Sequence, residues 1–388
     1  MIGCPCVFTP GIDSNLEFFA GAEPLFSKNT LVVFHRITSV LILTVVGPGF
    51  SGMAAFAALV AQDDVLGQPA KDPIQRQPNA PEPDEKSAPI AAAATDFDGA
   101  AAYEYLKKIC DIGPRPSVSV GMTRQRELLT KHFEELGATI IVQTFDARDP
   151  NTGSLVQLSN LMARWHPERK NRLLLCCHYD TRPFPDRDTQ NPTGVFLGAN
   201  DGGSGVAVLC ELGKFIDGMD GKYGVDFVFF DGEEFVFVAQ RDPMFLGSTF
   251  FANEYATRKF DWKYQFGVLL DMVGDANLQI YYEGNSFGFA PRLTRSIWSV
   301  AHDLGIKEFI PKQRHKINDD HLPLNSIARI DTCDIIDFDY PDPDAATKNA
   351  FWHTQQDTVE NCSADSLGKV GRVMLEWLRQ MQRLNKSK

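Results

Sequence analysis

The sequence predicts a three-layer α/β/α sandwich with a mixed, mostly parallel central sheet. Two observations lead to this fold class. Hydrophobic runs with strand character alternate along the chain with segments of helical spacing. Two of the runs, residues 225–230 and 266–270, are strongly apolar. Such strands are typical of a parallel sheet that helices cover on both faces.

The individual elements follow from local patterns. Helices are expected where apolar residues recur every three or four positions, at residues 98–112, 123–136, 203–216, 291–304 and 364–384. Strands are expected in the short alternating or apolar runs at residues 139–145, 160–165, 172–177, 225–230 and 266–270. Because ligands of such sheets bind at the carboxyl ends of the strands, polar residues that follow the strands are candidates for a functional site.

The first 95 residues differ in composition from the rest. Residues 1–61 are expected to be a leader, because residues 37–60 carry no charge, follow Lys28 and Arg36, and approach the roughly 20 residues that span a bilayer. An export signal and a membrane anchor both fit, whereas Gly47-Pro48-Gly49 would break a buried core helix. Residues 62–95 lack aromatics and predict a disordered linker rich in Pro and Ala. Residues 96–388 are expected to form one folded, catalytic domain.

Composition excludes some classes of protein. The net charge is −12, and no basic stripe stands out, which argues against a nucleic-acid partner. The eight cysteines form no CxxC pair, so a structural cysteine zinc site is not expected. Cys176 and Cys177 lie in an apolar run and are expected to be buried. Membrane association is expected only through the N-terminal segment.

Acidic and imidazole side chains follow the predicted strands or lie in later loops. Each has an ordinary explanation when taken alone, as a hydrogen-bonded structural histidine, a turn residue or a solvated surface pair. Together, at one edge of one sheet, they would supply the nitrogen and oxygen ligands that a divalent metal needs. These candidates are His178, Asp201, Glu233, Glu234, Asp271 and His353.

Six motifs occur in a fixed order: Cys177-His178-Tyr179-Asp180, Gly198-Ala199-Asn200-Asp201, Phe229-Phe230-Asp231-Gly232-Glu233-Glu234, Leu270-Asp271-Met272-Val273-Gly274, Asp319-Asp320-His321-Leu322-Pro323 and Trp352-His353-Thr354. Together they resemble the zinc aminopeptidase superfamily known as peptidase family M28. Within it, they resemble most the animal-type glutaminyl-peptide cyclotransferases, or glutaminyl cyclases. The resemblance covers about residues 109–384 and implies a zinc-exopeptidase-like fold.

The resemblance to the cyclases implies one zinc ion, held by Asp201, Glu234 and His353, with one position open for a ligand. The substrate would be a peptide or protein whose N-terminal glutamine is converted to pyroglutamate with release of ammonia.

It also implies catalytic roles for three carboxyl groups. Glu233 would take the proton of the attacking α-amine and return it to the leaving ammonia. Asp271 and Asp320 would form a hydrogen-bonded acidic pair beside Glu233. Trp352 would form a wall of the substrate pocket.

Two alternatives remain open. Aminopeptidases of the family bind two zinc ions, in which case His178 and Asp271 would hold the first, Glu234 and His353 the second, and Asp201 would bridge them. All these residues are present, so their identity does not exclude hydrolysis of N-terminal residues. The other alternative is a non-catalytic binding domain on a membrane anchor, against which the intact ligand set argues.

Details of the chain bear on the choice between cyclase and peptidase. Twelve residues separate Glu234 from Gly247, a longer link than is typical of the aminopeptidases and similar to that of the cyclases. The tryptophan that cyclases carry soon after their glutamate pair is absent, with Val238 in that region, and this departure bears on substrate affinity. The second cysteine of their usual disulfide, expected near Val206, is also absent, although Cys210 lies four residues further along.

Overall fold

The computed structural model describes residues 35–37, 40–42, 96–341 and 350–383. Its contacts divide the chain into two units, Met1–Ser87 and Ala88–Lys388. The described part of the first unit is a pair of antiparallel strands, β1 (His35–Ile37) and β2 (Val40–Ile42). The predicted leader and linker otherwise lie outside the described residues. Within those residues, no helix combines the length and the hydrophobicity that crossing a bilayer requires.

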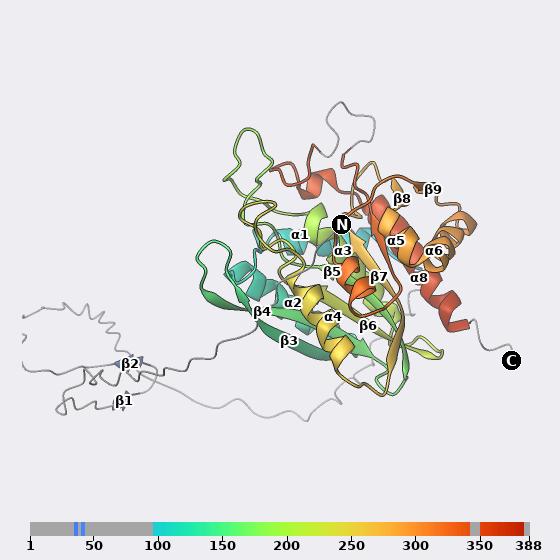
Figure 1. The fold of residues 1–388 in the computed structure, drawn as a ribbon, viewed down its shortest axis with the longest axis horizontal. Coiled ribbons are helices and arrows are strands. Elements are labelled where there is room, and N and C mark those ends of the chain that lie inside the picture. Colours follow the sequence, from blue (N-terminus) through green and yellow to red (C-terminus); the bar gives the residue numbers. More distant parts are fainter. Residues whose placement is uncertain (1–34, 38–39, 43–95, 342–349, 384–388) are drawn as a thin grey trace, which may run out of the picture. The chain divides into compact units, whose positions relative to one another are not determined.

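The second unit is built around a six-stranded mixed sheet (Figure 1). Its strands are β3 (Thr139–Arg148), β4 (Leu155–Trp165), β5 (Asn171–His178), β6 (Tyr223–Phe230), β7 (Lys263–Asp271) and β10 (Thr332–Ile336). They lie in the order β10-β7-β5-β6-β4-β3. The first four of this order are parallel, whereas β4 is antiparallel to both of its neighbours. The prediction of a mixed, mostly parallel sheet is therefore confirmed.

Helices cover both faces of the sheet, which confirms the three predicted layers (Figure 1). One face carries α1 (Gly99–Cys110), α2 (Val120–Glu135), α3 (Gly205–Leu212), α6 (Pro291–Asp303) and α8 (Ala364–Arg383). The other face carries α4 (Leu246–Thr257) and α7 (His321–Ser326). Side chains of β5 alternate between the two cores: Leu173 and Leu175 belong to the first, Leu174 and Cys176 to the second.

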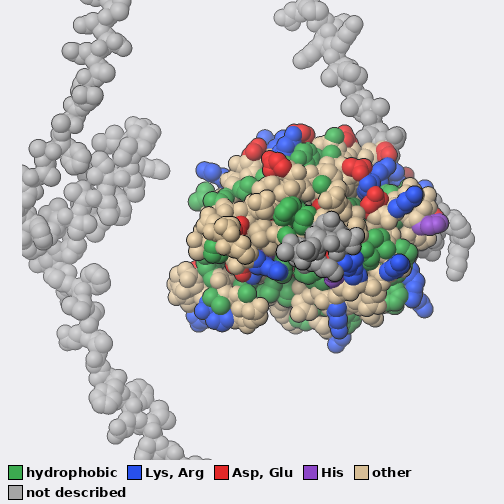
Figure 2. All heavy atoms as spheres, turned by 90° about the horizontal axis from the view of Figure 1, so that it is seen from above, with side chains coloured by type: hydrophobic (Ala, Val, Ile, Leu, Met, Phe, Trp, Pro, Cys, Tyr) green, Lys and Arg blue, Asp and Glu red, His purple; other side chains and the backbone are tan. Residues whose placement is uncertain are grey.

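Smaller elements complete the second unit beside β10. They are β8 (Ile280–Tyr282), α5 (Gly284–Phe289) and β9 (Phe309–Gln313). β8 and β9 pair in parallel, and α5 packs between α6 and β10. On the face in Figure 2, the described Lys and Arg side chains lie in separate patches among acidic and hydrophobic ones.

The structure differs from the predicted elements in several places. α3 begins at Gly205, two residues later than predicted, because Asn200–Ser204 form a tight irregular turn. α4 and β10 were not predicted. The apolar residues of α4 form no single stripe, and Gly247 and Ser248 in its first turn are weak helix formers. Cys176 and Cys177 are buried, as predicted.

All six cysteines of the described second unit are free and buried. They include Cys110 and Cys210, so Cys210 forms no disulfide within this part of the chain.

Gly205, the first residue of α3, packs where a side chain cannot fit. A Cβ there would overlap the backbone oxygen of Leu270 and lie 2.8 Å from the Cβ of Cys177. We therefore expect Gly205→Ala to lower the free energy of unfolding by about 1–3 kcal/mol, as overpacking of a core usually does. Urea unfolding measures this change. Gly218→Ala is the control, because a Cβ at Gly218 meets nothing within 4 Å; equal stability of the two variants would contradict the prediction.

Candidate active site

The carboxyl edge of the parallel strands brings the predicted site residues together. His178 is the last residue of β5 and Asp271 is the last residue of β7. Glu233 and Glu234 lie in the loop that follows β6. Asp201 lies in the turn before α3, whose N-terminus faces the same edge. The last member, His353, comes from the loop that leads to α8.

Asp201, Glu234 and His353 form a compact, buried cluster. Nε2 of His353 lies 3.3 Å from Oδ2 of Asp201 and 3.2 Å from Oε1 of Glu234. Ligand atoms at about 2 Å from a tetrahedral zinc ion lie about 3.3 Å from one another. The three side chains therefore have the spacing of ligands to one metal ion.

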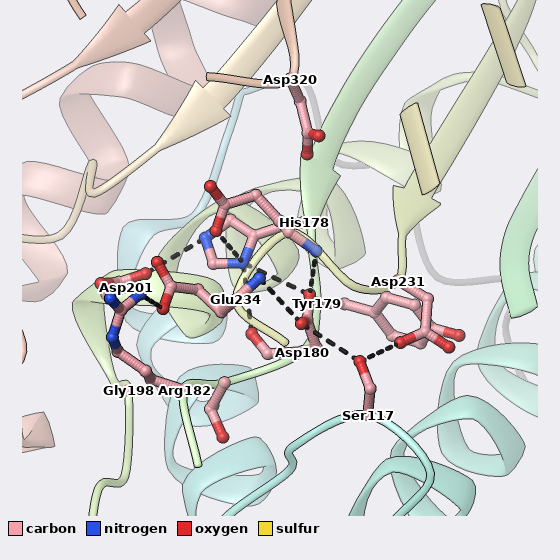
Figure 3. Close-up of polar contacts among 12 residues, drawn as sticks. Ser117, His178, Tyr179, Asp180, Arg182, Gly198, Asp201, Asp231, Glu234 and Asp320 are labelled. Carbon is pink, nitrogen blue, oxygen red and sulfur yellow. Dashed lines mark hydrogen bonds and ion pairs between the residues drawn. The ribbon is translucent and has the colours of Figure 1, made fainter. Parts of the chain in front are cut away.

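A second cluster shares Asp201 with the first. Nε2 of His178 lies 3.2 Å from Oδ1 of Asp201 and 3.2 Å from Oδ1 of Asp271. Each oxygen of Asp201 thus faces a different histidine. Figure 3 shows His178, Asp201 and Glu234 pointing toward one another. Both of the predicted metal-ligand sets are assembled.

The electrostatics of the first cluster favour a cation. Burial acts to raise the pKa of Asp201, but hydrogen bonds and charges from His178 and His353 outweigh it and lower the pKa. Burial also opposes ionisation of Glu234, yet His353 and Arg182 lower its pKa to about 2. Burial lowers the pKa of His353, but the charge of Glu234 and contacts with Asp186 and Asp201 raise it to about 10. The carboxylates are therefore ionised and attract positive charge.

Two buried atoms test whether a metal fits. Beyond their contacts within the cluster, the buried atoms Oδ2 of Asp201 and Nε2 of His353 have no hydrogen-bond partner. Buried polar atoms normally have partners, so these two point to a missing ligand. Two carboxylates and one imidazole are a common donor set for zinc. The residues of this cluster therefore fit a zinc ion.

Arg182 and Asp186 form an outer layer that sequence reasoning missed. The guanidinium of Arg182 contacts Oε2 of Glu234, and Nε of Arg182 lies 2.9 Å from Oδ1 of Asp186. Oδ1 of Asp186 lies 3.4 Å from Nδ1 of His353. The pair links two of the cluster residues and orients them, as outer carboxylates and cations commonly do at metal sites. Their only signal in the sequence is that they follow His178 closely.

Asp357, also missed, holds the turn that carries Asp201. Its carboxylate accepts hydrogen bonds from the backbone N–H groups of Asn200 (2.7 Å) and Asp201 (3.1 Å). Within this turn Gly202 has a φ of 87°, and a Cβ there would overlap the carbonyl oxygen of Asp180. Position 202 therefore requires glycine both for its backbone conformation and for lack of space.

Glu233 lies beside the clusters and is free to carry a proton. The backbone N–H groups of Glu233 and Glu234 donate to the two oxygens of Asp180, at 3.2 and 3.0 Å. With its backbone fixed by these hydrogen bonds, Glu233 has its Oε2 3.9 Å from Nδ1 of His178. Burial and then the charge of Glu234 raise the pKa of Glu233 well above its usual value. A buried carboxyl group with a raised pKa is suited to general acid–base catalysis.

The two aspartates before α7 have different surroundings. Asp319 lines the pocket at the metal clusters, and Oδ1 of Asp320 instead accepts a hydrogen bond from the hydroxyl of Ser248. Figure 3 shows Asp320 apart from the other labelled residues, with no dashed line that joins it to them. The expected hydrogen bond between Asp271 and Asp320 is absent among the described residues, since the second oxygen of Asp320 is unpartnered. Burial and then the charge of Asp271 raise the pKa of Asp319.

The clusters open into a pocket of about 220 Å³. Trp352 lies on its wall, as the sequence predicted, with its ring centre 4.0 Å from that of His353. The guanidinium of Arg187 covers the Trp352 ring at 4.5 Å. Met244, from the long loop after Glu234, also lines the pocket. An aromatic wall beside acidic groups suits a small, flat polar group.

A mixed, mostly parallel sheet covered by helices on both faces, with a buried cluster of potential metal ligands at its carboxyl edge, places the protein in the class of α/β proteins whose site lies at the ends of the strands. Comparison with known proteins agrees. The model of Peptidase family M28 matches residues 160–378, and the chain belongs to this family.

Solved structures and curated proteins give more detail. Glutaminyl cyclase of Fimbriiglobus ruber is 38% identical with a TM-score of 0.68, over 76% of this chain and 99% of that one. A Zn-dependent exopeptidase of Parabacteroides distasonis is 31% identical with a TM-score of 0.67, over 74% of this chain and 98% of that one. The curated glutaminyl-peptide cyclotransferase of Bothrops jararaca is 27% identical, over 67% of this chain and 76% of its own length. The predicted family resemblance is therefore confirmed.

The low pKa of Glu234 predicts how acid affects the metal-free protein. The pKa of this carboxyl group is 4.5 in the unfolded chain and about 2 in the folded protein. The ionised group therefore stabilises the fold fully above about pH 4.5. That contribution is lost as the pH falls toward about 2. We expect the unfolding free energy of the metal-free wild type to fall more between about pH 5 and pH 3 than that of metal-free Glu234→Gln. Urea unfolding at each pH measures it, and parallel losses in the two proteins would contradict the assignment.

Proposed function

We propose that this protein is a zinc-dependent glutaminyl-peptide cyclotransferase, which converts N-terminal glutamine of peptides to pyroglutamate and releases ammonia. The observation that carries the proposal is the placement of Glu233, a buried carboxyl group with a raised pKa beside a three-residue metal cluster. The similarity to the Fimbriiglobus ruber and Bothrops jararaca cyclases supports this reaction.

The chain's residues divide the work of the reaction. Asp201, Glu234 and His353 would hold one zinc ion, which as a Lewis acid would polarise the γ-carboxamide oxygen. Glu233 accepts a proton from the α-amine as the amine nitrogen bonds to the carbonyl carbon of the side-chain amide, Cδ. It then gives the proton to the departing nitrogen, which leaves as ammonia when the old C–N bond breaks. Ring closure is intramolecular, so the pocket's main task is to hold the side chain folded back.

Neighbouring residues support this proton transfer. Glu234 and then Asp319 and Asp320 bring like charge near Glu233 and raise its pKa, and like charge helps a carboxyl group to keep its proton. Asp319 takes the role that the family resemblance implied for Asp320, because Asp319 lines the pocket. Trp352 stacks on the flat amide and excludes water from it.

Hydrolysis of N-terminal residues is the second candidate. The second cluster of His178, Asp201 and Asp271 favours it, because two metal ions would bind an activated water between them. The similarity to the Parabacteroides distasonis exopeptidase points the same way. A non-catalytic binding domain has less support, since both ligand sets and Glu233 are intact.

We also propose peptide and protein N-termini as the partners of the enzyme. From the uncharged residues 37–60 we propose that the enzyme is exported or anchored at a membrane by its N-terminal segment. Cell fractionation tests this location.

Mass spectrometry of a Gln-initiated peptide tests the reaction. Cyclisation removes one ammonia from the peptide, whereas an aminopeptidase shortens it by one residue. We expect Glu233→Gln to bind zinc as the wild type does and to lose about 10²–10⁴-fold in turnover, the usual contribution of a general base. Glu211→Gln is the control, because Glu211, which lies on α3, is also buried but pairs with Lys214. Full activity of Glu233→Gln would show that the base is elsewhere.

Metal content tests the ligand assignment. We expect about one zinc ion per wild-type chain and almost none in His353→Ala, because an open tetrahedral site needs all three protein ligands. His302→Ala is the control, since the His302 side chain is 89% exposed. Elemental analysis of the dialysed proteins measures the ratio. Two ions per chain would favour the peptidase. An unchanged zinc content in His353→Ala would show that the metal is bound by other residues.

A further inference from the structure

Glu283, at the end of β8, ties distant segments together. It caps α5 by accepting hydrogen bonds from the N–H groups of Asn285 (2.8 Å) and Ser286 (2.6 Å) and from the Ser286 hydroxyl (2.8 Å). Its Oε1 also accepts from the N–H of Ile317, at 2.8 Å, which lies 34 residues away. The side chain is 2% exposed. One carboxylate thus serves both a helix cap and a remote loop.

The same junction fixes the other backbone group of Ile317. Nδ2 of Asn285 donates to the Ile317 carbonyl oxygen at 2.7 Å, and the N–H of Gly284 donates to the carbonyl of His315 at 2.7 Å. Ile317 lines the active-site pocket, as do the next two residues, Asn318 and Asp319. The part of the pocket wall at Ile317 is therefore hydrogen-bonded to Glu283 and Asn285.

Glu283 also meets the far end of the same segment. Nε2 of His321, the first residue of α7, lies 3.3 Å from Oε2 of Glu283. Nδ1 of His321 faces Oδ2 of Asp334, in β10, at 3.7 Å. Each nitrogen of this fully buried imidazole therefore faces a different carboxyl group. Neither nitrogen makes a hydrogen bond of ordinary geometry, so Glu283 bonds the segment that carries Asp319 at Ile317 and contacts it at His321.

We propose that Glu283 is a positioning residue, which fixes Asp319 at the pocket wall by bonding the N–H of Ile317 on one side of it and packing against His321 on the other. The inference rests on the proposed function, because it assigns Glu283 to the placement of an acid used in that reaction. Two other roles compete with it. The first is a purely structural role, in which Glu283 only stabilises α5. The second is metal binding, since Glu283, His321 and Asp334 offer ligand atoms within 4.8 Å of one another.

Glu283→Gln and Asn285→Ala are the test variants. The first keeps the size of the side chain but places an amide N–H₂ against donors, and the second removes only the bond to the Ile317 carbonyl. We expect kcat to fall about 10–100-fold in Glu283→Gln and several-fold in Asn285→Ala, because small misplacements near the chemistry can cost about 10²-fold. KM and zinc content should change little. Glu308→Gln is the matched control, because Glu308 bonds Lys369 and does not line the pocket.

A double-variant cycle separates positioning from general destabilisation. If Glu283 acts through Asp319, Glu283→Gln should cost far less kcat in an Asp319→Asn background than in the wild type. Equal loss in both backgrounds, or wild-type kcat in both Glu283→Gln and Asn285→Ala, would overturn the proposal. A metal ion that the wild type holds and Glu283→Gln loses would also overturn it and assign a metal site.

The order of measurements keeps this inference distinct from the proposed function. The product of the wild type is determined first. If the wild type shortens the peptide instead of cyclising it, cyclisation is wrong. The same kcat comparison is then made for hydrolysis, and non-additivity with Asp319→Asn still decides whether Glu283 positions the pocket wall.

Discussion

The structure depends on one electrostatic constraint, which is the crowding of buried carboxyl groups at the carboxyl edge of the sheet. A carboxylate taken out of water is unfavourable unless a positive partner or hydrogen bonds compensate. His353 and Arg182 lower the pKa of Glu234, whereas Glu233 approaches His178 only to 3.9 Å, and burial and the charge of Glu234 raise its pKa. Adjacent residues of one loop are thereby divided into a ligand and a proton carrier, the division that acid–base catalysis needs.

The same device holds each loop of the site. A buried carboxylate from another segment accepts backbone N–H groups of the loop: Asp180 holds the glutamate pair, Asp357 holds the turn with Asp201, and Glu283 holds the loop before Asp319. Charge-assisted hydrogen bonds of this kind are strong and directional. Loops that lack regular secondary structure can therefore present side chains at fixed distances.

Much of the fold was predictable because its signals are local. The apolar runs that became β5, β6 and β7 need no partner to be recognised, and each ends at or just before a site residue. α4 was missed because its burial comes from the sheet it covers rather than from a clear stripe in its own sequence. Arg182 and Asp357 were missed because they act on residues that are brought near only by folding.

By itself, the sequence determined the family and the layered fold, and it predicted the residues that assemble into the two clusters at the edge of the sheet, because these depend on residue type and on position relative to strands. The tertiary structure alone decided which of two adjacent aspartates faces the pocket. Asp319 and Asp320 are identical in chemistry, but the start of α7 directs one toward the pocket and the other toward Ser248. That choice is made by backbone direction and by contacts from distant segments, which no local pattern encodes.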